Sequence, residues 1–234
     1  MRMKRAALIA GLLGMAVALT GCGAGVQGET DTASYEVDDQ VRALRVTADS
    51  GTIEVVESQR QGVQVTERLT WRKNKPKTSH QVQDGTLALT FDCPASWGLG
   101  AIGTSCDVSY RVEVPRGLRV EVGSDSGDLT LKGLSGELDA RSDSGAIRAE
   151  GLAVKQAVAK TDSGDVELAF TGSPDKVTAA SDSGRVEVGV PQGAYNVVAR
   201  TDSGAKDVKV PTDPSAPRRI ELTSDSGDLE VRTS

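Results

Sequence analysis

The sequence predicts an all-β protein, a β-solenoid built from coils of about 20 residues. Two observations carry this prediction: a turn triplet recurs at regular intervals, and apolar and polar residues alternate on both sides of it. The triplet Asp-Ser-Gly occurs seven times, ending at Gly51, Gly127, Gly145, Gly164, Gly184, Gly204 and Gly227. The last six glycines are 18 to 23 residues apart, which is within the range of solenoid repeats.

The positions around each glycine have the period of two that is typical of strands. The residues seven and five before the glycine and four after it are apolar in every copy, and the residues between them are mostly polar. At Gly164 these apolar residues are Ala157, Ala159 and Leu168. Each coil should therefore run strand, Asp-Ser-Gly turn, strand, and stacking should pair each strand with its equivalent in the next coil.

Three parts of the chain depart from the repeat. Lys206 stands two residues after its glycine, where the other copies carry an apolar residue, so we expect a bulge or slipped register there. Segment 56–110 has no Asp-Ser-Gly and is expected to form a hairpin insertion or an N-terminal cap ahead of the regular repeats in 111–234. The last coil, which runs to Ser234, has no obvious capping segment.

The N-terminus has the features of an export signal. Cations at Arg2, Lys4 and Arg5 precede an apolar stretch over residues 6–19, which is too short to span a bilayer of about 30 Å. The run Leu-Thr-Gly-Cys that ends at Cys22 resembles the bacterial lipobox, and this resemblance implies that Cys22 is acylated and becomes the mature N-terminus. The alternative is an ordinary signal peptide with a coincidental cysteine.

This organisation assigns residues 1–21 to a lipoprotein signal peptide, 22–34 to a lipidated flexible tether of small polar residues, and 35–234 to the solenoid domain. Loss of the signal changes the formal charge from −6 to −9. Such an acidic chain is not expected to bind nucleic acid, and its lipid rather than attraction to anionic headgroups should anchor it. We expect it on the extracytoplasmic face of the cell membrane.

Cys93 and Cys106 remain after export, and an even number of cysteines outside the cytoplasm favours one disulfide. Closing a loop of about 14 residues is worth on the order of 3 kcal/mol. A metal site at these two residues would lack the further ligands that zinc needs. Trp97 lies within the loop in an apolar cluster, and it is either a contact site or part of a lid on the end of the solenoid.

The repeat of strand, Ser-Gly and strand resembles the putative-adhesin family of bacterial surface proteins, the DUF4097-like β-solenoid domain. The resemblance extends to Val114-Pro115-Arg116-Gly117 and covers about Tyr35 to Ser234. It implies a solenoid displayed at the cell surface, and it supplies no catalytic residues.

The aspartates of the triplets are expected to point outward in a file along one edge. In one interpretation each accepts a hydrogen bond from the N–H of its own glycine in an Asx-turn, and the glycine supplies a positive φ. In the other, carboxylates of neighbouring coils hold calcium, with Asp125, Asp143, Asp162, Asp182, Asp202 and Asp225 as ligands. No other cofactor is expected. Ser or Thr three residues before the glycine should point inward and form a hydrogen-bonded ladder.

Composition argues against most enzymes, because His80 is the single histidine and aromatic residues make up 3% of the chain. We expect a non-catalytic surface module that contacts cell-wall polymer, an envelope protein or copies of itself. One alternative is a scaffold that binds calcium or polymerises from an open C-terminal coil. Another is a polysaccharide-acting β-helix enzyme with acids paired between coils, although equivalent aspartates do not supply the separated pKa values that such a pair needs.

Overall fold

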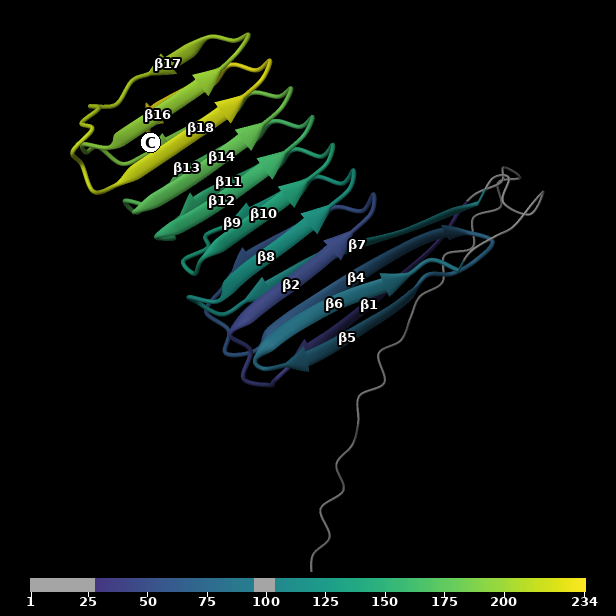
Figure 1. The fold of residues 1–234 in the computed structure, drawn as a ribbon. Helices are drawn as coiled ribbons and strands as arrows, with labels where there is room; N and C mark the ends of the chain where they lie inside the picture. Colours follow the sequence, from purple (N-terminus) through teal and green to yellow (C-terminus); the bar gives the residue numbers. More distant parts are fainter. Residues whose placement is uncertain (1–27, 95–103) are drawn as a thin grey trace, which may run out of the picture.

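The computed structural model describes residues 28–94 and 104–234, and over these residues the chain forms two β-sheets and no helix (Figure 1). No helix of the described residues is therefore long and apolar enough to cross a membrane. The first sheet has ten strands and the second has nine. Both lie along the same axis, so the molecule is an open stack of coils, as the sequence predicts.

Neighbouring strands within each sheet come from successive layers of the stack. In order across the sheet, the ten-stranded sheet contains β1 (Glu29–Val37), β4 (Val63–Arg72), β7 (Ser105–Val114), β3 (Ile53–Glu57), β9 (Leu129–Lys132), β11 (Ile147–Leu152), β13 (Val166–Phe170), β15 (Val186–Val190), β19 (Leu229–Thr233) and β17 (Lys206–Val208). The nine-stranded sheet contains β16 (Asn196–Thr201), β18 (Arg219–Ser224), β14 (Lys176–Ser181), β12 (Gln156–Thr161), β10 (Leu138–Ser142), β8 (Arg119–Ser124), β2 (Ala43–Ala48), β6 (Thr86–Asp92) and β5 (Lys77–Gln83).

Each Asp-Ser-Gly turn joins a strand of the nine-stranded sheet to a strand of the ten-stranded sheet. Equivalent strands of successive coils pair in parallel at equivalent positions, so Ala140 of β10 lies opposite Ala159 of β12. The apolar positions predicted from the period of two point between the sheets, where Ala159, Val166 and Leu168 are no more than 1% exposed. The core is therefore a thin, mostly aliphatic layer that repeats from coil to coil, with Tyr110, Phe170 and Tyr195 as its largest fully buried side chains.

The coils do not stack in the order of the sequence. The last coil, β18–β19, lies between β14–β15 and β16–β17, so the chain passes one layer and then folds back to fill it. This arrangement buries Leu229 and Val231 to 1% exposure or less, whereas every residue of β17 is exposed. The prediction that the C-terminal coil is the open one is wrong, because the polar β16–β17 coil stands at that end.

The bulge expected at Lys206 is also absent, since Lys206 lies opposite Leu229 in regular register with β19. The equivalent residue points into the core in the other coils. A lysine is tolerated here because β17, at the end of the stack, is exposed. A register shift occurs instead between Ala149 and Leu152 in β11, next to Gly151, whose φ is 68°.

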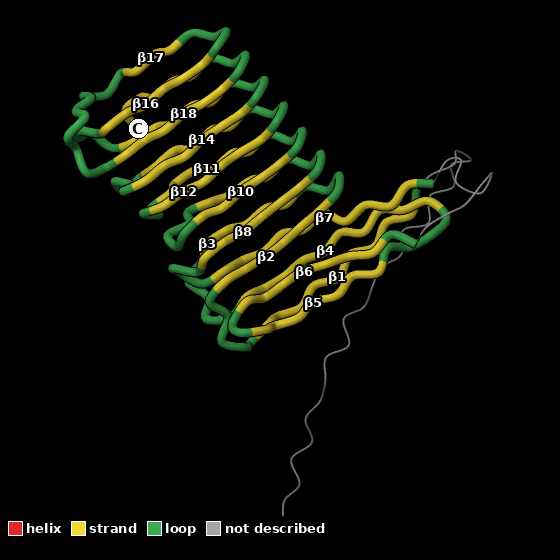
Figure 2. The backbone as a smooth tube through the Cα atoms, in the orientation of Figure 1, coloured by secondary structure: helices red, strands yellow, loops and turns green. Residues whose placement is uncertain are grey.

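At the other end, β6 and β7 add one more layer in which a long connection replaces the Asp-Ser-Gly turn. β4 and β1 then extend the ten-stranded sheet with antiparallel pairing, and β5 extends the nine-stranded sheet in the same way. These strands project beyond the line of turns (Figure 2). The predicted tether 22–34 is too long, because Glu29 to Ser34 belong to β1. Their side chains are exposed on an edge strand, so their composition resembles that of a flexible segment.

Candidate functional site

The turn edge is held together by a column of glycines that leaves no space for a side chain. A Cβ atom built on any of the seven triplet glycines would lie 1.8 to 2.1 Å from a carbonyl oxygen of the neighbouring layer. At Gly164, for example, that oxygen belongs to Gly145 and is 2.1 Å away. None of the seven has a positive φ. The expected reason for glycine is therefore wrong, since close approach of the coils, rather than a left-handed turn, requires it.

The hydroxyls three residues before the glycines form the predicted ladder and also close the turns. The Gly184 N–H donates to Ser181 Oγ at 2.8 Å, and the Ser181 hydroxyl donates to the carbonyl oxygen of Gly164 in the preceding coil at 2.8 Å. The same N–H contact occurs at Gly127, Gly145, Gly164 and Gly227. The Asx-turn prediction is wrong for these five turns, because the hydroxyl takes the place expected for the aspartate.

The predicted aspartate file is exposed at the turns, with the six residues in the spatial order Asp125, Asp143, Asp162, Asp182, Asp225 and Asp202. Backbone hydrogen bonds join the turns, as between the Ser144 N–H and the Asp125 carbonyl at 2.8 Å. Within residues 28–94 and 104–234, no three His, Cys, Asp or Glu side chains converge as a metal site. The calcium ladder therefore has no ligand cluster in this part of the chain.

A second aspartate column, directly after the glycines, was missed from the sequence. Asp128, Asp165 and Asp228 each accept the N–H of the equivalent residue in the next coil, at 2.8 to 2.9 Å. Those N–H groups belong to Ala146, Arg185 and Ala205, so Asp and another residue alternate along the stack. In sequence order the alternation holds from Thr52 to Arg185 and breaks at Ala205. It continues to the end of the stack only when the last coil is placed before the sixth.

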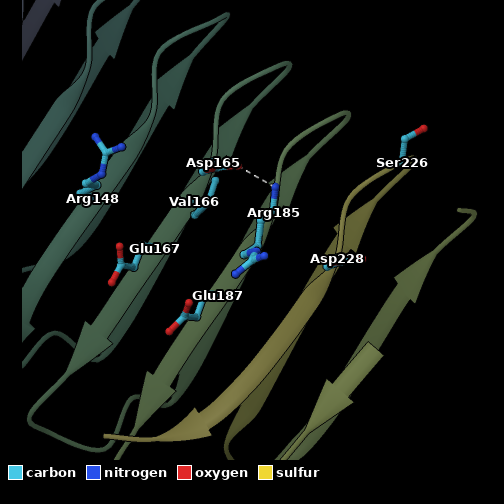
Figure 3. A pocket seen from close by; sticks show the side chains of 8 residues that line it. All are labelled: Arg148, Asp165, Val166, Glu167, Arg185, Glu187, Ser226 and Asp228. Carbon is cyan, nitrogen blue, oxygen red and sulfur yellow. Dashed lines mark hydrogen bonds between the residues drawn. The ribbon is translucent and has the colours of Figure 1, made fainter. Parts of the chain in front are cut away.

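The outer face of the ten-stranded sheet has two adjoining hollows of about 490 and 290 Å³, which share Arg148 and Glu167. We call them the charged trough. The larger hollow is also lined by Asp165, Val166, Arg185, Glu187, Ser226 and Asp228 (Figure 3). Arg148 pairs with Asp128 at 3.2 Å and Glu187 pairs with Arg232 at 2.5 Å.

Four charged side chains of the trough form no salt bridge with a described residue: Asp165, Glu167, Arg185 and Asp228. The carboxylates of Asp165 and Asp228 each accept a backbone N–H instead. Neither the Arg185 guanidinium nor the Glu167 carboxylate forms a salt bridge or side-chain hydrogen bond with any residue that the structure describes. Glu167 belongs to β13, and Arg185 directly precedes the neighbouring strand β15, in which Glu187 lies opposite Glu167. Arg185 and Glu167 are therefore the charged groups of the trough that have neither a salt bridge nor a side-chain hydrogen bond among the described residues, and they come from neighbouring coils.

A buried polar cluster fastens β1 to the body. Glu67 occupies a core position of β4 with 2% exposure, and Tyr35 Oη of β1 donates to its carboxylate at 2.7 Å. Burial, with a smaller contribution from Glu67, raises the pKa of Tyr35 and of Tyr110 well above the ordinary value. His80 stacks on Tyr35 with 4.5 Å between ring centroids. The cluster lies at the end of the stack where β1 and β5 form the edges of the two sheets.

Cys93 and Cys106 form a disulfide, with an S–S distance of 2.07 Å and Cα atoms 5.9 Å apart. It joins the segment after β6 to the start of β7. Cys22 and Trp97, the predicted lipidation site and contact residue, lie outside the described residues.

These features define a class of protein, the repetitive β-solenoids that display a broad charged sheet face. The family model described as Toastrack DUF4097 matches residues 104–232, and the chain belongs to this family. The resemblance recognised in the sequence is thereby confirmed.

Two solved structures are similar to the chain over most of its length. One is described as a "putative cell adhesion protein" from Clostridium sporogenes ATCC 15579, with 13% identity, a TM-score of 0.52, and coverage of 89% of this chain and 100% of that one. Another is a "putative adhesin" from Bacteroides fragilis NCTC 9343, with 14% identity, a TM-score of 0.48, and coverage of 90% and 100%. At 13% identity the likeness to the first of these structures shows the fold alone. No curated protein matches the sequence.

Proposed function

We propose that this protein is a non-catalytic lipoprotein, anchored through Cys22 on the extracytoplasmic face of the cell membrane, whose solenoid binds components of the cell envelope. The Toastrack family and the adhesin names of its structural neighbours support a surface module. The lipobox ending at Cys22 supports the anchor.

The observation that carries the binding role is the charged trough. Its unpaired guanidinium suits a carboxylate, and its unpaired Glu167 suits an ammonium group. Peptides of bacterial wall polymer carry both groups, and each coil adds another row of charges along the same face. A long polymer would thus meet repeated weak contacts, which multivalency strengthens.

The test is co-sedimentation of the full-length, lipidated protein, in detergent, with purified cell-wall sacculi. Arg185→Ala and Glu167→Ala should each lower the bound fraction, whereas Lys160→Ala, which removes an exposed cation from β12 on the other sheet, should not. Wild-type protein that stays in the supernatant would contradict wall binding. Wild-type binding that all three variants retain would exclude the trough as the contact.

Self-association is a second candidate, because Val208 of the edge strand β17 is the one large apolar side chain that is exposed among the described residues. Features that protect an edge are present as well, since β17 has three residues, begins with Lys206 and is followed by Pro211. Growth of particle size with concentration in light scattering would support association through this edge. A constant size, or growth unchanged by Val208→Lys, would contradict it.

A further inference from the structure

A further hollow lies on the outer face of the ten-stranded sheet, nearer the β1 edge than the charged trough. Its volume is about 250 Å³, and strands β1, β4, β7 and β3 contribute residues to it. It shares no residue with the charged trough. We call it the hydroxyl hollow, because its lining includes Thr32, Thr52, Thr66 and Ser109.

The hydroxyl groups surround Arg68 of β4. On one face of a sheet, the neighbours of a side chain lie two residues along the same strand and directly opposite on the adjacent strands. For Arg68 these neighbours are Thr66 and Thr70 on β4, Thr32 on β1 and Ser109 on β7. The guanidinium therefore has a residue with a hydroxyl group on every side.

Arg68 also lacks a carboxylate partner. The four cations that strands β7, β9, β11 and β19 carry each form a salt bridge, namely Arg111, Lys132, Arg148 and Arg232. Arg68 is exposed and forms no salt bridge or side-chain hydrogen bond with any residue of 28–94 and 104–234, including its diagonal neighbour Asp107. Its positive charge is therefore open to a ligand.

The charge balance of the hydroxyl hollow is positive. Its charged lining residues are two cations, Arg68 and Arg111, and one anion, Glu54. Glu54 is bound by Arg111 and also by Lys132, which is 3.3 Å away. This carboxylate is consequently held by two cations that do not include Arg68, and an anion is the ligand that the hollow favours.

The hydroxyl groups add donors to this cation. Ser109 Oγ accepts the Thr52 N–H at 3.3 Å, so its own proton remains to be donated. The Thr32 hydroxyl forms no hydrogen bond within the part of the chain that the structure describes. Donors from three neighbouring strands suit an anion whose oxygens point in several directions. A phosphate group has that geometry, whereas the two oxygens of a carboxylate lie in one plane.

We propose that the hydroxyl hollow binds the phosphate group of a phosphate ester, with Arg68 as the cation and Thr32 and Ser109 as hydroxyl donors. The volume equals that of about eight molecules of liquid water, so the hollow accommodates the esterified carbon chain as well as the phosphate. The inference depends neither on Cys22 nor on the charged trough, because it uses no residue of either.

The test is phosphorus NMR of two small ligands, glycerol phosphate and the diester glycerophosphoglycerol, with the full-length protein in a phosphate-free detergent at fixed ionic strength. The ligand signal should broaden as protein is added, with a dissociation constant on the order of 1 mM. Arg68→Ala should weaken binding roughly tenfold or more, and Arg68→Lys should weaken it less. The matched control Arg200→Ala, on β16 of the other sheet, should not change it.

The two ligands distinguish the sources of the phosphate. Tighter binding of the diester would support the proposal with a phosphodiester polymer or a lipid headgroup as the ligand, and tighter binding of the monoester would support it with a small soluble ester. Absence of broadening with both ligands would overturn the proposal, as would broadening that Arg68→Ala leaves unchanged while its circular dichroism spectrum is that of the wild type. Displacement of either ester by an equal concentration of acetate would overturn the choice of phosphate.

Discussion

Replacing Gly164 by alanine tests the glycine column directly. The new Cβ would lie 2.1 Å from the Gly145 carbonyl oxygen and 2.6 Å from its carbon, whereas carbon and oxygen atoms normally remain more than about 3 Å apart. The two layers must separate by roughly 1 Å at the turn. Two bonds then lengthen: the Thr161 hydroxyl to the Gly145 carbonyl, now 3.1 Å, and the Ser163 N–H to the Asp143 carbonyl, now 3.0 Å.

Each weakened bond costs about 1 kcal/mol, and overpacking adds about 1 to 3 kcal/mol. The expected loss of about 3 to 5 kcal/mol should lower the thermal midpoint by roughly 6 to 20 °C in a domain of this size. Circular dichroism of the purified protein measures it. Gly123→Ala is the control, because the nearest atom to its Cβ is 4.0 Å away and its φ is ordinary. A midpoint for Gly164→Ala equal to that of Gly123→Ala would refute the close-approach explanation.

Ser181→Ala leaves the buried Gly184 N–H without its partner and should cost about 1 to 3 kcal/mol, whereas Ser181→Thr should cost less; equal urea midpoints for both would count against the hydroxyl ladder. Above about pH 10 the tyrosines of the unfolded chain ionise, whereas the raised pKa keeps Tyr35 neutral in the folded protein. The free energy of unfolding should therefore fall as the pH rises, and it should fall less in Tyr35→Phe. Parallel pH profiles of the two proteins would contradict this. Reducing the disulfide should lower the unfolding free energy by about 3 kcal/mol, and an unchanged urea midpoint would show that the cross-link does not constrain the unfolded chain.

The strand pattern was predictable because it is local. Alternation around each triplet places Val166 and Leu168 in the core whichever coil they pack against. The order of the coils was not predictable in the same way, since every coil presents nearly the same pairing edges and any one fits on any other. Lys206 was the signal for the end coil, but a polar residue at a core position also fits a bulge, and the sequence does not separate the two.

The turn residues illustrate a second limit. Glycine fits either a positive φ or a close backbone contact, and both aspartate and serine accept hydrogen bonds from backbone N–H groups. The residue types at Ser181 and Gly184 therefore predict a turn without assigning its hydrogen bonds. Glu67 was missed because a single acidic residue in a strand of alternating polar and apolar residues does not reveal its partner. That partner is Tyr35 of β1, more than 30 residues earlier in the chain.

The most direct test of the central proposal is the intact mass and location of the mature protein in cells that produce it. The proposed surface lipoprotein should be found in the membrane fraction, begin at Cys22 and carry the mass of a diacylglycerol group, and Cys22→Ala should remove both the lipid mass and the mature membrane-bound form. A wild-type chain that is cleaved at another residue, carries no lipid and is released from the membrane would contradict the account.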